Sequence, residues 1–426
     1  RRTVIELCDV ATGHLDASIR RSWRPDGLVH SYRLLELDPE GSTAAVRDLP
    51  EMLEGQVAAL GSGALDPGEQ ADLFDALLAS GLHRPDLDTF LLAPVRSLPS
   101  FLDKNVVPAA DVEGDPLLSA LIERGERSLI HRDADGRHRF RADLTDVVAL
   151  EAALDRLAAD EAWRSLVDAH RHHVVATFER VFDHHAHLGR SGTMYAYEGI
   201  GSVYWHMVAK LLVAVQRALR EAHDGGADAE VVDRLRAAYW RVRSGLGVNR
   251  SAAEFGAIPT DPYSHTPAHA GAQQPGMTGA VKEEILTRPL ELGVRVVDGD
   301  IAFDPLLLRR SELLDEPVRW SVDGVDGASA VVELAPGTLG LTICQVPVVV
   351  GLADEDDPSV EVELASGERV AGSGARLGCD HSAEVFGRSG RIRAIRVRLP
   401  AVGVSRSTVT PPGHDRGDED HTPAVR

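Results

Sequence analysis

The spacing of apolar residues changes once along this sequence, near Pro305, and this change constrains the fold more than any other feature. Upstream, apolar side chains recur every three or four residues, most regularly over 200–222, which is the pattern of a helix with one buried face. Downstream, apolar and polar residues alternate, as in VEVEL at 360–364, which is typical of a strand with one buried face. The sequence therefore predicts helices first and strands afterwards.

The predicted architecture is mainly α and has two parts. A helical domain spans 1–310, and an antiparallel β-sandwich spans 311–400, where turn residues separate the alternating runs. Residues 401–426 contain few apolar side chains and are expected to form a disordered tail. Within the helical domain a turn is expected at 23–27, and helices are predicted in two segments between 48 and 80 and over 115–125, 145–160, 160–188, 200–222, 228–243 and 278–292.

The charge balance limits the partners that the chain can have. Lys and Arg number 45 against 66 Asp and Glu, which gives a formal net charge of −21. An acidic surface repels phosphate backbones and anionic lipid, so neither nucleic acid nor a membrane is expected as a partner. No apolar run reaches about 18 residues and no secretory leader is recognised, so a cytoplasmic location is expected. The first residue is Arg1 rather than Met, which leaves open that an N-terminal half of a longer polypeptide precedes it.

The first candidate site is the aromatic segment YAYEGIGSVYW at 195–205, where the longest predicted helix begins. Aromatic faces with polar tips stack on sugar rings, and a carboxylate and an imidazole bind sugar hydroxyls. Glu198 is the best catalytic candidate, and the positive end of the helix dipole suits it to act as a base, a nucleophile or a hydroxyl acceptor. Alternatively, Tyr204 and Trp205 are core residues, and Glu198 only stabilises the N-terminus of the helix. The candidate sugar-binding residues are Tyr195, Tyr197, Trp205 and His206.

The second candidate site is 259–279, PTDPYSHTPAHAGAQQPGMTG, a long segment of turn-forming residues with one charged side chain, Asp261. Loops longer than about 12–15 residues without secondary structure are uncommon in compact domains and are often functional. Alternatively, the prolines make this segment a rigid structural crossover. Its uncharged donors suit a neutral polyhydroxyl ligand or a phosphate, and the candidate binding residues are Tyr263, His265, Thr266, His269, Gln273 and Gln274.

The remaining carboxylates complete the list of catalytic candidates. Asp261, Asp103 and Glu54 are possible partners of Glu198, because glycosidic cleavage needs a proton donor and a second carboxylate or a phosphate opposite it. Glu283 and Glu284 are assigned a structural role instead, since the second of them can pair with Arg288 one helical turn later.

Metal and cofactor sites are not predicted. Six histidines between 170 and 187 are distributed over several helix faces, and prolines interrupt the spacing of His265 and His269. Cys8, Cys344 and Cys379 are too far apart in sequence for a metal motif. The glycine-rich nucleotide motifs and the G-x-S-x-G motif are also missing from the sequence, which argues against nucleotide binding and acyl transfer.

Three blocks, SGTMYAYEGIGSVYWHM, DPYSHTPAHAGAQQPGMTGAVKEEIL and ELGVRVVDGDIAFDP, together resemble the C-terminal part of bacterial carbohydrate-active proteins of the six-hairpin glycosidase type. Their layout is similar to that of the cellobiose-phosphorylase group. The resemblance implies an α/α toroid of paired helices, with the sugar bound at the mouth where the inner helices begin. The sequence departs from the family in having too few predicted helices for a closed toroid and no clear Trp-Asn-Asp element, so an incomplete toroid is expected.

These observations favour a glycoside hydrolase or a glycoside phosphorylase acting on a glucan-type oligosaccharide or polysaccharide. No cofactor is expected, although a phosphorylase would use inorganic phosphate as a co-substrate. The alternative is a non-catalytic carbohydrate-binding or scaffold fragment of a larger enzyme. An enzyme should bring two carboxylates to the mouth, whereas a binding module needs only aromatic and amide side chains.

Overall fold

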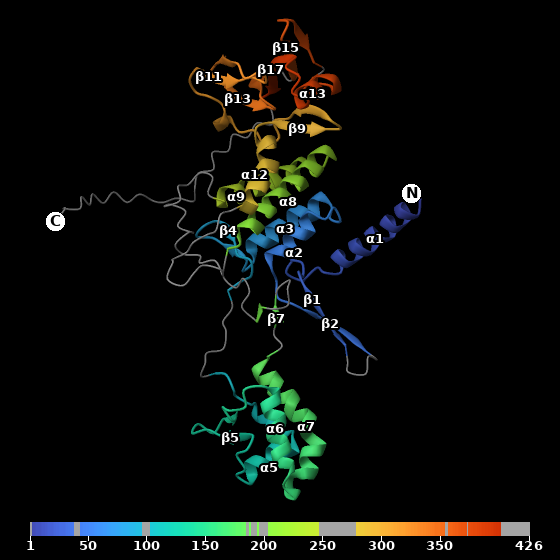
Figure 1. Cartoon of the computed structure of the whole chain (residues 1–426), viewed down its shortest axis with the longest axis vertical. Helices are drawn as coiled ribbons and strands as arrows, with labels where there is room; N and C mark the ends of the chain where they lie inside the picture. The colour runs from blue at the N-terminus through green and yellow to red at the C-terminus, as the bar shows by residue number, and fades with distance from the viewer. Residues whose placement is uncertain are drawn as a thin grey trace, which may run out of the picture. The chain divides into compact units, whose positions relative to one another are not determined.

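The computed structural model describes residues 2–37, 43–95, 103–184, 187–188, 194–195, 203–246, 278–353, 357–372 and 374–401. The chain divides into two compact units (Figure 1). Unit 1 comprises Arg1–Val29, Gln56–Phe90 and Val203–Arg426, and unit 2 comprises His30–Gly55 and Leu91–Ser202. The change of periodicity near Pro305 therefore lies inside unit 1. Among the described helices, none is long and apolar enough to cross a membrane.

The helices predicted from apolar spacing between 48 and 292 are present. α3 (Pro67–Ala79) begins where Asp66 and Pro67 predict it, and a capping box links the Asp66 side chain to the Glu69 N–H and the Glu69 side chain to the Asp66 N–H. The other predicted helices are α2 (Leu53–Leu60), α5 (Pro116–Glu123), α6 (Val147–Ala158), α7 (Glu161–Phe182), α8 (Trp205–Asp224), α9 (Ala229–Gly245) and α12 (Thr278–Glu291).

The helical core of unit 1 is built around α8, which packs against both α9 and α12 (Figure 1). Twelve residues of α8 are buried, including Gln216, so this helix has an almost fully enclosed face. A close approach fixes the end of α9: a Cβ added to Gly245 would meet the Asp88 carbonyl oxygen at 2.2 Å. That carbonyl lies in the turn between the short strands β3 (His83–Arg84) and β4 (Thr89–Phe90).

The N-terminal residues form a helix that the sequence analysis did not predict. α1 (Arg2–Arg20) contains Gly13 and several β-branched residues, which are weak helix formers, and it has no buried residue. Arg20 connects the end of α1 to the rest of unit 1 through Glu69 Oε1 at 3.0 Å and the Ala64 carbonyl at 2.7 Å. The predicted turn at 23–27 is confirmed, with an antiparallel bridge between Trp23 and Val29.

Strands follow in the C-terminal part of unit 1; the alternating pattern predicts those after residue 311, whereas the first hairpin lies within the predicted helical domain. The hairpin β9 (Val294–Val297) and β10 (Asp300–Phe303) comes first, and the pair β11 (Val318–Asp323) and β12 (Ser329–Leu334) follows η1 (Arg310–Glu312). A five-stranded sheet then has the order β13-β14-β17-β15-β16. Its strands are β13 (Thr338–Ile343), β14 (Val346–Ala353), β15 (Ser359–Leu364), β16 (Arg369–Ala371) and β17 (Ile392–Pro400).

This sheet differs from the predicted antiparallel arrangement in one pairing. β14 and β17 run parallel, with Val348 opposite Ile395, while the other neighbours are antiparallel. A parallel pair requires a crossover, which is supplied here by β15, β16 and the short helix α13 (Cys379–Phe386). The apolar face of the sheet forms one core with the β9–β10 hairpin and α13. The predicted β-sandwich and toroid stay predictions, and the predicted tail lies outside the described residues from 402 onward.

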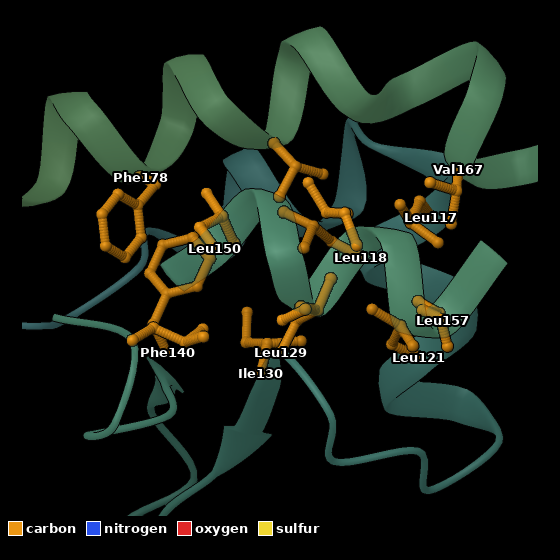
Figure 2. Close-up of a cluster of buried hydrophobic side chains, with 14 of the residues drawn as sticks. Leu117, Leu118, Leu121, Leu129, Ile130, Phe140, Leu150, Leu157, Val167 and Phe178 are labelled. Atoms are coloured by element: carbon orange, nitrogen blue, oxygen red, sulfur yellow. The ribbon is translucent and has the colours of Figure 1, made fainter. Parts of the chain in front are cut away.

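Unit 2 contains a helical core between residues 107 and 182 (Figure 2). Leu117, Leu121, Phe140 and Phe178 are among the side chains that fill it, and the rings of the last two meet edge to face at 5.1 Å. Its remaining elements are α4 (Ala109–Glu113), β1 (Arg33–Leu37), β2 (Ala44–Asp48), β5 (Ile130–Arg132), β6 (His138–Phe140), β7 (His187–Leu188) and β8 (Met194–Tyr195).

We expect Phe178→Ala to destabilise this core by about 3–5 kcal/mol, because it removes a fully buried ring and leaves a cavity. Val148→Ala, in a side chain that is 78% exposed on α6, is the control and should change stability little. Denaturant unfolding of the full chain, followed by far-UV circular dichroism, measures both. Equal small effects for the two variants would show that the core is not packed as described.

Candidate functional site

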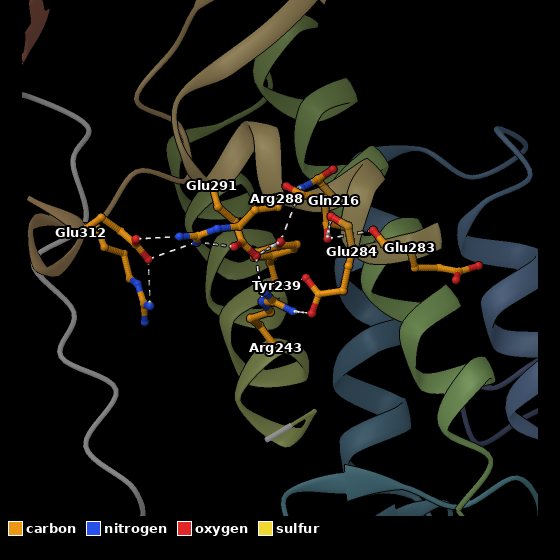
Figure 3. A network of polar contacts seen from close by, with 10 residues as sticks. Gln216, Tyr239, Arg243, Glu283, Glu284, Arg288, Glu291 and Glu312 are labelled. Atoms are coloured by element: carbon orange, nitrogen blue, oxygen red, sulfur yellow. Dashed lines mark hydrogen bonds and ion pairs between the residues drawn. The ribbon is translucent and has the colours of Figure 1, made fainter. Parts of the chain in front are cut away.

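Polar side chains of α8, α9 and α12 gather where these three helices pack together (Figure 3). In the first turn of α8, His206 Nε2 lies 3.4 Å from Oε1 of Glu283 on α12. At the last turn of α9, the guanidinium of Arg243 binds both carboxylate oxygens of Glu284 at 2.5 and 2.9 Å. The three helices are therefore joined by contacts between side chains of opposite charge or complementary hydrogen-bonding capacity.

Tyr204 and His206 are partly exposed members of this cluster and adjoin the buried Glu283. The Tyr204 hydroxyl lies 3.5 Å from His206 Nδ1, and the three side chains range from 36% exposed for the tyrosine residue to 9% for the Glu283 side chain. Glu283 Oε2 is buried, and none of the described residues donates a hydrogen bond to it. A hydroxyl, an imidazole and a carboxylate that lie next to one another can accept and donate protons. They can also bind a ligand that carries hydroxyl groups.

Glu291 is the buried centre of the adjoining network. Its carboxylate is 1% exposed, accepts a hydrogen bond from the Tyr239 hydroxyl, and lies 2.9 Å from Arg243 Nε and 2.8 Å from Arg288 Nη1. Arg288 also binds both oxygens of Glu312 at 3.1 and 2.8 Å. The network thus links α9 and α12 to η1, which lies between β10 and β11 in the chain (Figure 3).

The network shifts the proton affinities of its members. Burial and the neighbouring carboxylate of Glu291 raise the pKa of Tyr239 far above the ordinary range, so this hydroxyl stays protonated and donates. Burial opposes the charge of Arg243, yet its carboxylate partners raise its pKa on balance. The hydrogen bonds from Arg288 lower the pKa of Glu312. Each group is thereby held in the charge state that its partners require.

The sequence contained a signal for this network that the helical prediction did not use. Glu283, Thr287 and Glu291 recur every four residues on α12, and all three are buried. On a packed helix, residues at that spacing form the buried face and are usually apolar. Polar residues at these positions therefore indicate hydrogen-bonding partners inside the core. Gln216 of α8 supplies one of them, because its Nε2 donates to the Thr287 carbonyl oxygen at 3.0 Å. The pairing expected between Glu284 and Arg288 is not formed, since each has a guanidinium or carboxylate partner on another element.

Most residues predicted to form the site lie outside the described residues. The backbone of Tyr195 belongs to β8, and Trp205 is only 4% exposed, which fits the core role that the sequence left open for it. His206 is placed in the cluster described above. The candidates outside the described residues are Tyr197, Glu198, Asp261, Tyr263, His265, Thr266, His269, Gln273 and Gln274.

The two described catalytic candidates belong to unit 2. Glu54 lies in the first turn of α2 and accepts a hydrogen bond from the Tyr32 hydroxyl, which occupies part of its capacity as an acceptor. Asp103 is exposed in a turn. Neither belongs to the cluster of unit 1. Among the described residues that could hold a metal ion, Asp115, His170 and His173 of unit 2 form a group whose ligand atoms lie within 4.8 Å of one another.

Comparison with known proteins identifies one region. Residues 98–185 match the GH149 phosphorylase insertion domain 2, which covers about a fifth of the chain and includes the helical core of unit 2. None of the curated proteins matches the chain. The match relates the chain to the carbohydrate-active phosphorylases, and it supports the expected relationship to glycoside hydrolases and phosphorylases.

We expect Glu291→Gln to destabilise unit 1 by about 3–5 kcal/mol, because it removes the charge between a buried and a half-buried guanidinium group. Glu333→Gln, which breaks an exposed ion pair with Arg319, should change stability little. Denaturant unfolding of the two variants measures the difference. If both lose the same small amount, Glu291 does not hold the helices together.

Acid should weaken the link to η1. Because the folded-state pKa of Glu312 is lowered, its contribution to stability is complete above the ordinary carboxyl pKa of 4.5 and is lost as the pH falls through the folded value. The stability difference between the wild type and Glu312→Gln should therefore be largest near neutral pH and shrink below pH 4.5. Unfolding curves recorded across this range test it, with exposed Glu316→Gln as the control for loss of one surface charge. A difference that is constant with pH would contradict the assignment.

Proposed function

We propose that this chain is part of a glycoside phosphorylase that acts on a glucan-type oligosaccharide with inorganic phosphate as co-substrate. The observation that carries the proposal is the match of residues 98–185 to a phosphorylase insertion domain. An insertion domain accompanies a catalytic domain, so we expect the catalytic site among the residues outside 98–185. The three sequence blocks that resemble six-hairpin glycosidases lie in that remainder.

The cluster at the start of α8 supports a ligand rich in hydroxyl groups. Tyr204 and His206 present a hydroxyl and an imidazole at the surface, and Glu283 supplies a carboxylate beneath them. A mixture of donors and acceptors beside an aromatic ring is suited to a sugar, which offers hydroxyl groups and apolar C–H faces. The cluster is held in place by the Glu291 network, so the polar side chains are positioned before a ligand arrives.

In this proposal Glu198 is the reacting carboxylate, and the cluster binds the sugar beside it. Glu198 precedes the first residue of α8 by seven positions in the sequence. Glycosyl transfer to phosphate needs a proton donor for the leaving oxygen and a nucleophile on the opposite face of the sugar. Glu198 would be that nucleophile, phosphate would then displace it from the sugar, and Asp261 is the candidate proton donor. The uncharged donors of 259–279, including His265 and Thr266, would bind the phosphate.

A non-catalytic carbohydrate-binding or scaffold fragment is the second candidate. The observation that favours it is that the matched region is an insertion domain and not a catalytic one. In this case the cluster of Tyr204, His206 and Glu283 would bind a sugar without turning it over, and the reacting groups would lie on another part of the enzyme.

We expect Glu198→Gln to lower phosphorolysis at least 100-fold, roughly 2.7 kcal/mol of transition-state stabilisation, with little change in stability. The matched control is Glu230→Gln, which changes an exposed carboxylate in the first turn of α9. Release of sugar 1-phosphate from gluco-oligosaccharides, measured with and without inorganic phosphate, provides the readout. Sugar binding without turnover in the wild type would favour the binding fragment, and cleavage that needs no phosphate would favour a hydrolase.

A further inference from the structure

One histidine of unit 2 interrupts an otherwise apolar helix face. On α7, Trp163, Val167, Val174 and Phe178 are buried and form the stripe that packs on the core. His170 falls in the same stripe, three residues after the first valine and four before the second. An imidazole in this position must be matched by a polar partner, because an unsatisfied buried polar group is costly.

That partner is the carboxylate of Asp115, which is fixed by its role as the N-cap of α5. Its Oδ1 accepts hydrogen bonds from the N–H groups of Leu117 at 2.9 Å and Leu118 at 3.0 Å, and Pro116 sets the first helical residue. The side chain is only 5% exposed. Oδ2 remains buried, and no described residue donates a hydrogen bond to it.

The two buried atoms face each other without forming a hydrogen bond. His170 Nδ1 lies 4.0 Å from Asp115 Oδ2, and neither atom has a hydrogen-bond partner among the described residues. His173, one helical turn later, places its ring 6.0 Å from that of His170 and is exposed. The three ligand atoms all lie within 4.8 Å of one another.

We propose that Asp115, His170 and His173 bind one divalent transition-metal ion, with Zn²⁺ as the expected occupant. Zinc binds nitrogen and carboxylate oxygen at about 2.0–2.2 Å in tetrahedral geometry, so two ligand atoms on the same ion are about 3.4 Å apart. The two buried atoms, which are 4.0 Å apart, reach that separation after a small approach of the His170 and Asp115 side chains. The exposed His173 can close the remaining distance by a small rotation of its side chain.

The ligand set determines the class of ion. Two imidazoles and one carboxylate favour late first-row divalent ions over Mg²⁺ and Ca²⁺, which prefer oxygen ligands. The exposed third ligand leaves the remaining coordination positions to water. The ion would join the N-terminus of α5 to the middle of α7, so it would stabilise the domain whether or not the chain is a phosphorylase. The competing explanation is that a water molecule or a proton on His170 compensates the Asp115 carboxylate.

The test is titration of the full-length chain with Zn²⁺ after chelator treatment and dialysis. We expect one tight site per chain by calorimetry and a higher unfolding temperature in the presence of Zn²⁺. His170→Ala should weaken this site at least 10-fold and abolish the temperature shift. Asp115→Asn is the second variant, because an asparagine residue still caps α5 while the ligand charge is lost, so the fold is retained.

His172→Ala is the matched control, because it removes an exposed histidine of the same helix that is outside the group. It should bind Zn²⁺ as the wild type does. The chain has 18 histidines, so weak surface binding is expected in every variant and does not count as the site. Loss of the site in the control as well, equal affinity in the wild type and His170→Ala, or Mg²⁺ binding as tightly as Zn²⁺, would overturn the proposal.

Discussion

The buried carboxylate of Glu291 is the interaction on which the arrangement of unit 1 depends. It receives a hydroxyl from α9 and guanidinium groups from α9 and from its own helix, and one of these guanidinium groups reaches on to Glu312 in η1. A buried charge is tolerated only where its partners are complete, so the network allows a narrow range of positions for α12 relative to α9. Because Glu283 lies on α12, the same constraint fixes its position relative to His206 and Tyr204.

Periodicity predicted the main helices and the strands after residue 311, because both repeats follow directly from burial of one face. It did not predict the short strands β1–β10, which lie within the predicted helical domain. It did not predict the parallel pairing of β14 and β17, since strand direction depends on the crossover between them rather than on the pattern within either strand. α1 was not predicted because it buries no residue, so it has no apolar face packed on a core that periodicity could indicate. The sequence pattern predicts elements that bury one face, but it predicts neither the direction of strand pairing nor elements that pack on no core.

The candidate site was only partly predictable. Aromatic enrichment before α8 drew attention to His206, which contacts Glu283, and the same criterion included Trp205, which is buried. Glu283 was assigned a structural role together with Glu284, because Glu284 was expected to pair with Arg288 one helical turn later. The decisive information was long-range, since Arg243 and His206 reach α12 from elements 41 and more residues away in the chain. Local spacing cannot show such a contact.

The polar positions of α7 and α12 show how this information could be recovered from a sequence. In each helix a titratable residue, His170 or Glu291, stands at a spacing that belongs to the buried stripe. Because a core excludes unpaired polar groups, such a residue requires a partner from another element or a ligand. For Glu291 the partners are all protein groups, so the network is structural. For His170 the facing carboxylate oxygen is too distant for a hydrogen bond, which leaves room for the proposed metal ion between the two groups. This distinguishes the pair from the structural network around Glu291.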